Sequence, residues 1–169
     1  MTTIFRTIAV TTLVIAALFS APTHAQQVLK SDDIAKIKTD VHAAMEKYRT
    51  AFNRRDSKAI GDSSFTSPSV AMGGDGVVVK TPDQIDKQYA GSTSKLAEIG
   101  WVESVPVRYD ICVINANTAL YNGLYNRVRK DGSVITPTAT TYLLNKGKDG
   151  WRIAALFGHS FTHTMTCSE

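Results

Sequence analysis

His159 is the residue of this sequence whose side chain most readily suggests chemistry. It continues an alternating row of residues, Trp151, Ile153, Ala155 and Phe157. If that row faces the interior, His159 does too, since alternate residues of a strand share one face. An imidazole titrates near neutral pH and could serve there as a general base. The alternative, which we favour, is a histidine at a strand end that hydrogen-bonds to the backbone.

A second group of candidates consists of tyrosines and threonines on two adjacent strands. The Asp131-Gly132 pair predicts a hairpin turn. Pairing through this turn brings Tyr121 and Tyr125 to the face of alternate residues on the next strand, Thr138, Thr140, Tyr142 and Leu144. Such hydroxyls could orient a small ligand in an apolar cavity, with Phe157 and His159 beside them. The alternative is an exposed or dimer-forming face, because a shift of one residue exchanges the two faces.

Other kinds of site find little support. The sequence has no HExxH or CxxC motif for a metal and no Gly-x-Ser-x-Gly turn for a serine nucleophile. Its Gly-rich run, 73–76, joins two short strands and does not open a helix, as a dinucleotide-binding loop would. Lys and Arg number 19 against 15 Asp and Glu, a net charge of +4, which is too mild and dispersed for a nucleic-acid footprint. We expect no metal, no cofactor and no nucleic-acid partner.

The elements that must position these residues begin with helices. Residues 31–55 carry an apolar stripe at helical spacing, with Ser31 as the expected N-cap: Ile34, Ile37, Val41, Met45, Tyr48 and Phe52. Asp56 should cap a short second helix to residue 60. Thr81, followed by Pro82 and by Gln84, predicts the start of a third helix that runs to about residue 98.

Strands make up the rest. Two short strands, 67–72 and 77–79, flank the Gly-rich turn, and a meander of four follows the third helix, over 101–115, 119–129, 134–145 and 151–160. With 169 residues, the chain is long enough for one α+β domain, which we place at residues 26–169 with a core over 32–160.

The first 25 residues predict export. Arg6 precedes an apolar run, 8–19, that is shorter than the roughly 20 residues needed to cross a membrane. A small-residue exit up to Ala25 completes the pattern of a secretory signal peptide. The protein should therefore be periplasmic or secreted, with no membrane span. In an oxidising compartment Cys112 and Cys167 should form a disulfide, although two free thiols remain the alternative.

Three motifs carry a resemblance to a known family. An aromatic helix end runs into Asn-x-x-Asp over 46–56, Gly150-Trp151-Arg152-Ile153 opens the last strand, and 155–158 end it with Ala-Leu-Phe-Gly. Their order and spacing resemble the nuclear transport factor 2-like superfamily, in particular small exported bacterial members of the SnoaL-like and ketosteroid-isomerase-like type. The resemblance implies a curved antiparallel sheet wrapped as a cone around the N-terminal helices, with an internal pocket.

The resemblance also implies roles for single residues. Tyr48 stands where ketosteroid isomerases carry an oxyanion-hole tyrosine, and Phe52 follows it one turn later. The alternative for Tyr48 is a plain core position. The isomerases' carboxylate base would fall in residues 71–74, and their protonated aspartic acid at Ala139 or Thr140, where this sequence has no acid. Ketosteroid isomerisation is therefore not expected, because no group could abstract the proton.

These observations leave three functions open. The first is an exported domain that binds a small, partly apolar molecule, with Tyr48, Phe52, Tyr121, Tyr125, Thr140, Tyr142, Phe157 and His159 as ligand-binding candidates. The second is an isomerase, cyclase or dehydratase in which Tyr48 polarises a carbonyl and His159 moves a proton. The third is a homodimeric interaction module. Loss of the acid positions favours the first.

Overall fold

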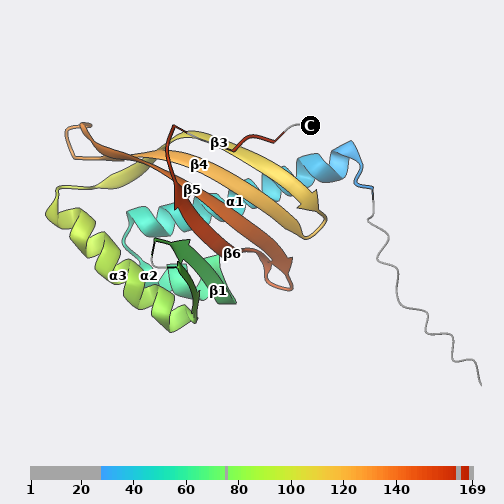
Figure 1. Cartoon of the computed structure of the whole chain (residues 1–169), viewed down its shortest axis with the longest axis horizontal. Coiled ribbons are helices and arrows are strands. Elements are labelled where there is room, and N and C mark those ends of the chain that lie inside the picture. The colour runs from blue at the N-terminus through green and yellow to red at the C-terminus, as the bar shows by residue number, and fades with distance from the viewer. Residues whose placement is uncertain (1–27, 75, 163–164, 168–169) are drawn as a thin grey trace, which may run out of the picture.

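The computed structural model describes residues 28–74, 76–162 and 165–167. The predicted signal peptide lies outside them. The chain forms helix α1 (Ser31–Asn53), the short helix α2 (Ser57–Ala59) with a π-helical turn (Ile60–Ser64), and helix α3 (Pro82–Glu98). Its strands are β1 (Phe65–Gly73), β2 (Gly76–Lys80), β3 (Glu103–Asn115), β4 (Thr118–Val128), β5 (Val134–Gly147) and β6 (Gly150–His159) (Figure 1). This is the predicted order of elements.

The helix boundaries follow local signals with one exception. Asp56 caps α2 by accepting from the Ala59 amide at 3.0 Å. Thr81 and Gln84 form the predicted capping box at the start of α3. The predicted cap at Ser31 is wrong: α1 begins at Ser31 itself, and Lys30 takes the N-cap position without a side-chain hydrogen bond.

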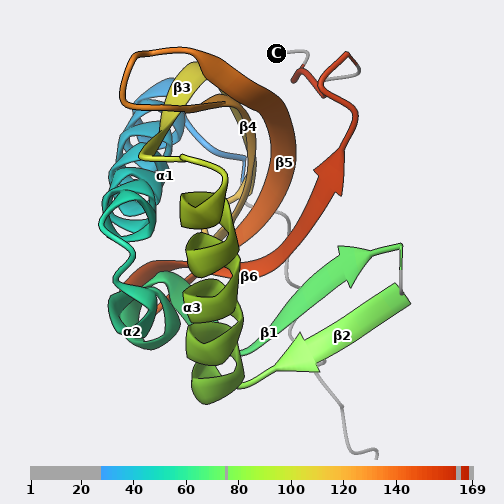
Figure 2. The same ribbon diagram turned by 90° about the vertical axis from the view of Figure 1, so that its left-hand side faces the viewer.

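The sheet is mixed, not wholly antiparallel. Its strand order is β2-β1-β6-β5-β4-β3, and the β1–β6 pair is parallel while the other pairs are antiparallel. The sheet curves around α1 and α3, which lie on its concave side (Figure 2). This is the expected α+β cone, with β1 and β2 added to the edge of the four-stranded meander through the parallel pair.

Each strand pair of the meander has at least one register irregularity, and the one between β5 and β6 bears on the candidate residues. On the β4–β5 side, Tyr121 pairs with Tyr142 and Tyr125 with Thr138, as the Asp131-Gly132 turn predicts. On the β5–β6 side, Leu143 pairs with Ala155 but Leu144 pairs with Ile153. The skipped residue is a β-bulge, and it exchanges the faces of β6 beyond it.

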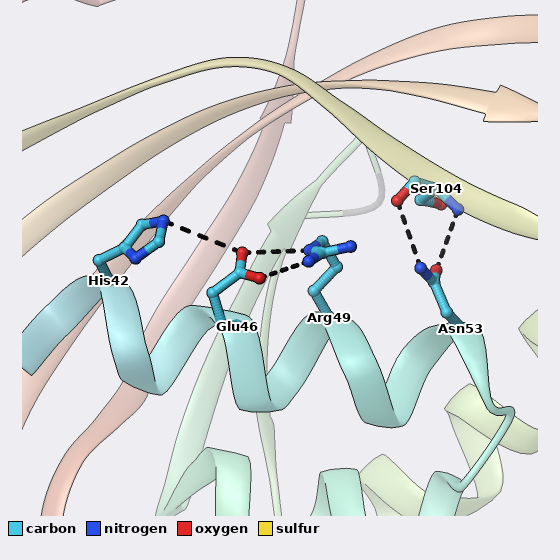
Figure 3. Close-up of polar contacts among 5 residues, drawn as sticks. All are labelled: His42, Glu46, Arg49, Asn53 and Ser104. Atoms are coloured by element: carbon cyan, nitrogen blue, oxygen red, sulfur yellow. Dashed lines mark hydrogen bonds and ion pairs between the residues drawn. The ribbon is translucent and has the colours of Figure 1, made fainter.

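Apolar residues of α1, α3 and the concave face of the sheet form the core, which includes Val41, Met45, Ile85, Tyr121 and Leu144. The end of α1 is attached to β3 by Asn53, whose Oδ1 accepts from the Ser104 amide at 2.9 Å and whose Nδ2 donates to the Ser104 carbonyl at 3.4 Å (Figure 3). This paired contact, formed where the sheet curves away from the helix, keeps the helix end beside the strand.

The C-terminal tail returns to β3. Cys167 forms a disulfide with Cys112, and their Cα atoms are 5.4 Å apart. The Cys167 amide also donates to Asp110 at 2.9 Å. Among the described residues, no helix has the length and apolar character required to cross a membrane.

Candidate functional site

A cavity of about 460 Å³ lies between the two long helices and the sheet. Residues of α1, α3, β3, β4, β5 and β6 line it, and four of them are tyrosines: Tyr48, Tyr89, Tyr125 and Tyr142. Its volume falls within the range of small-molecule sites. The elements of the cone therefore enclose a space suited to a ligand of modest size.

The tyrosines form a buried cluster. The hydroxyls of Tyr48 and Tyr89 are 3.0 Å apart, and the rings of Tyr48 and Tyr142 meet edge to face with centroids 5.6 Å apart. Burial raises the pKa of Tyr48 well above its usual value, and it raises the pKa values of Tyr89, Tyr125 and Tyr142 as well. The phenols are therefore neutral at physiological pH and offer hydrogen-bond donors.

Apolar side chains from α1, α3 and β6 lie among the tyrosines of the lining. Phe52 packs on Tyr89 and on Trp101, with ring centroids at 5.9 and 5.2 Å. Leu96 of α3 and Leu156 of β6 also line the space. A ligand in the cavity would therefore meet both hydroxyl groups and hydrocarbon.

The cavity also has basic residues, of which Arg49 is paired. Its guanidinium binds both carboxylate oxygens of Glu46, one turn earlier on α1, and His42 lies 4.0 Å from the same carboxylate (Figure 3). The hydrogen bond from Arg49 is the main reason that the pKa of Glu46 lies below its usual value. Glu46 is thus held as an ion-pair partner and is not available as a base.

The structure brings together five of the eight ligand-binding candidates. Tyr48, Phe52, Tyr125, Thr140 and Tyr142 all line the cavity. The other three do not line it. Tyr121 is buried in the core with 1% of its surface exposed, and its ring stacks on the ring of Tyr109 with centroids 5.4 Å apart.

The placement of Phe157 and His159 on the cavity side is wrong, and the β6 bulge is the reason. Leu156, not Phe157, pairs with the cavity residue Tyr142. Because a bulge shifts the alternation by one residue, Phe157 and His159 lie on the opposite face. His159 Nδ1 is 2.9 Å from the Ser160 carbonyl, the backbone contact that was the favoured alternative. Since a carbonyl only accepts, Nδ1 carries the proton.

Two important lining residues were missed as site candidates. Tyr89 stands on the buried stripe of α3 with Ile85 and Leu96, a spacing that predicts a core face and nothing more. Arg127 shares the face of Tyr125 on β4, but near a strand end an arginine is more often solvated. For Arg127 the signal was its position on the same face of β4 as Tyr125. For Tyr89 no local pattern gave a signal, because the packing of α3 on the sheet brings it to the cavity.

The family described as NTF2-like protein (DUF6841) matches residues 32–161. The chain belongs to this family. The resemblance to nuclear transport factor 2-like proteins is thereby confirmed. No curated protein matches the sequence.

Solved structures of NTF2-like proteins show the same fold. An NTF2-like protein with a cystatin-like fold from Novosphingobium aromaticivorans superposes with a TM-score of 0.60 at 12% identity, covering 74% of this chain and 82% of its own. A proposed ketosteroid isomerase from Shewanella frigidimarina superposes with a TM-score of 0.56 at 15% identity, covering 71% of this chain and 94% of its own. A proposed dehydratase of the NTF2-like family from Streptomyces avermitilis superposes with a TM-score of 0.59 at 14% identity, covering 74% of this chain and 96% of its own. At these identities the likeness establishes the fold alone.

Gly123 leaves room for the ring of Tyr125, which lines the cavity, and its replacement should displace that ring. A Cβ there would lie 2.5 Å from Cε2 and from the hydroxyl of Tyr125, so the ring must move. We expect Gly123→Ala to cost about 1–3 kcal/mol, or several degrees of melting temperature for a domain of this size. Gly147→Ala is the matched control, because nothing lies within 4 Å of a Cβ there. Equal melting temperatures for the two variants would contradict this account of Gly123.

Proposed function

We propose that this NTF2-like protein is an exported domain that binds a small, partly apolar molecule in its cavity. The observation that carries the proposal is the 460 Å³ space, whose lining combines four tyrosines with the apolar side chains of Phe52, Leu96 and Leu156. Sites for small molecules combine apolar walls with a few placed polar groups. The signal-peptide pattern of residues 1–25 and the disulfide support a periplasmic or secreted location.

Binding is favoured over acid–base catalysis by what lines the cavity. Among the described residues that line it there is no Asp, Glu or His. The tyrosines are neutral and hold their protons too tightly to act as bases near pH 7. A proton transfer near neutral pH requires a group with a matching pKa, and the described lining offers none.

A carbonyl-directed enzyme is the second candidate. The hydroxyls of Tyr48 and Tyr89 are 3.0 Å apart, so one donates to the other, and the O–H that remains could donate to a carbonyl oxygen and stabilise negative charge on it. The isomerase and dehydratase proposed among its structural relatives are compatible with such a role. A turnover that survives His159→Ala and is lost in Tyr48→Phe would favour this candidate.

A homodimer would need a surface other than the tyrosine face. Tyr121 and Tyr125 are 1% and 8% exposed, so they cannot form an interface. The edge strand β2 is the better surface, because Val77, Val78 and Val79 are all exposed there.

A thermal-shift screen tests the binding function. The purified protein is melted against a library of steroids, polyphenols, lipids and small acids. A ligand at about 100 times its dissociation constant adds about 2.7 kcal/mol to the free energy of unfolding. Thr140→Leu, which extends an apolar side chain into the cavity, should abolish the shift. Thr50→Leu, on the exposed side of α1, should retain it, and a shift that persists equally in both variants would place the ligand elsewhere.

A further inference from the structure

The charged residues among the described lining of the cavity are all basic. Its described lining includes three basic residues, Arg49, Lys95 and Arg127, and no acidic one. Arg49 is neutralised by Glu46, and Lys95 is exposed to water at the rim. Arg127 is half-buried, and no ion pair joins it to any described carboxylate. Among the described residues of the lining, it is therefore the partly buried cation without an ion-pair partner.

Arg127 lies in surroundings that penalise its charge. On β4 it is flanked by Ser104 of β3 and Thr136 of β5, and Tyr48 and Tyr142 are near enough to interact with it electrostatically. Burial is the main cause that lowers the pKa of Arg127. A partly desolvated guanidinium without a counter-charge is unfavourable for stability, and an anion bound beside it would offset that cost.

The neighbouring groups are suited to an oxyanion. Neutral phenols can donate hydrogen bonds but carry no charge that would repel it. Thr138 and Thr140 add two hydroxyls to the same lining. The planar fork of a guanidinium matches the two oxygens of a carboxylate, whereas a single uncompensated cation is a poor match for the double charge of a phosphate.

We propose that the cavity binds a small organic acid, with its carboxylate on Arg127 and the adjacent hydroxyls and its apolar body against Phe52, Leu96 and Leu156. This inference rests on the proposed binding function and names its ligand class. The 460 Å³ of the cavity suits an acid with one or two rings. The polar and the apolar residues of the lining then bind different parts of the ligand.

Matched acids and amides test the inference by titration calorimetry. The probes are phenylacetate, cinnamate and 2-naphthoate, each beside its primary amide, which has nearly the same shape but no charge. We expect at least one acid to bind roughly 10- to 100-fold more tightly than its amide, as a hydrogen-bonded charge pair implies.

Two glutamine variants assign the preference to one residue. In Arg127→Gln, the affinity for the acid should fall to the affinity for its amide. Arg129→Gln, two residues along the same chain but exposed and outside the lining, should keep the preference. Melting curves without ligand check folding, and Arg127→Gln should be at least as stable as the parent, because it removes an uncompensated charge.

The outcomes separate the two proposals. Acids that lose their advantage only in Arg127→Gln support the inference. Amides that bind as tightly as acids overturn it and leave the binding function standing, and so does an acid preference that persists in Arg127→Gln. If no acid or amide binds, the inference is overturned, and the broader thermal-shift library then decides the binding function by itself.

Discussion

The free energy of unfolding should fall steeply as the pH rises from 10 to 12. Burial raises the pKa of Tyr121 to about 12, and it raises the pKa values of Tyr48, Tyr89, Tyr125 and Tyr142. Below pH 10 these phenols are neutral in both the folded and the unfolded state, and their contribution to the free energy of unfolding is fully present. Above pH 10 the unfolded chain releases protons that the folded protein keeps, which costs about 1.4 kcal/mol per pH unit for each tyrosine.

The sum is comparable with the whole stability of a small domain. Five such tyrosines would remove about 7 kcal/mol at one pH unit above 10, out of the roughly 5–15 kcal/mol that is usual. Urea unfolding followed by circular dichroism at pH 9, 10, 10.5 and 11 measures the slope. Tyr89→Phe should reduce the slope by about one proton, whereas Phe52→Leu, which removes no phenol, should not. If the unfolding free energy of the parent protein changes with pH by less than one proton's worth, the tyrosine cluster is not buried as described.

Loss of the disulfide should produce the second large effect. Cys112 and Cys167 are separated by 55 residues, and a bridge over a loop of that length restricts the unfolded chain by about 4 kcal/mol in the entropy treatment. The double variant Cys112→Ala with Cys167→Ala should lose most of this stability in urea unfolding. The C-terminal tail should also become accessible to protease, since the bridge attaches it to β3.

Reduction provides an independent check of the disulfide effect. Treatment of the parent with a reductant should bring its unfolding midpoint to that of the double variant, which should itself not respond. Met165→Ala changes the same tail without opening the loop, and because Met165 is exposed it should cost no more than about 0.5 kcal/mol. An oxidised parent with the midpoint of the double variant would refute the expected stabilisation.

Local patterns predicted most of the elements. The apolar stripe of α1, the capping box at Thr81 and the Asp131-Gly132 turn each depend on residues a few positions apart, and the structure has the corresponding helices and hairpin. The hairpin turn also predicted that Tyr125 and Thr138 share a face, because a short turn determines the register of the strands that it joins.

The candidate site was predictable only in part. The face of Tyr125, Thr140 and Tyr142 was correctly assigned to the cavity side, since one hairpin sets their alignment. Arg127 belongs to that face too, but the role proposed for it depends on the lack of an ion pair with any described carboxylate, which is a property of the folded protein. Tyr89 reaches the cavity from α3, a helix whose position on the sheet no local pattern reveals.

By itself, the sequence determined the order of the helices and strands, the hairpin register and the NTF2-like family. These depend on periodicity, on capping and on motifs, all of which act over short stretches of chain. The tertiary structure alone decided that β1 pairs in parallel with β6 and that a bulge turns Phe157 and His159 away from the cavity. Both result from packing between residues far apart in the chain, where a single inserted residue reverses a face without altering the local pattern.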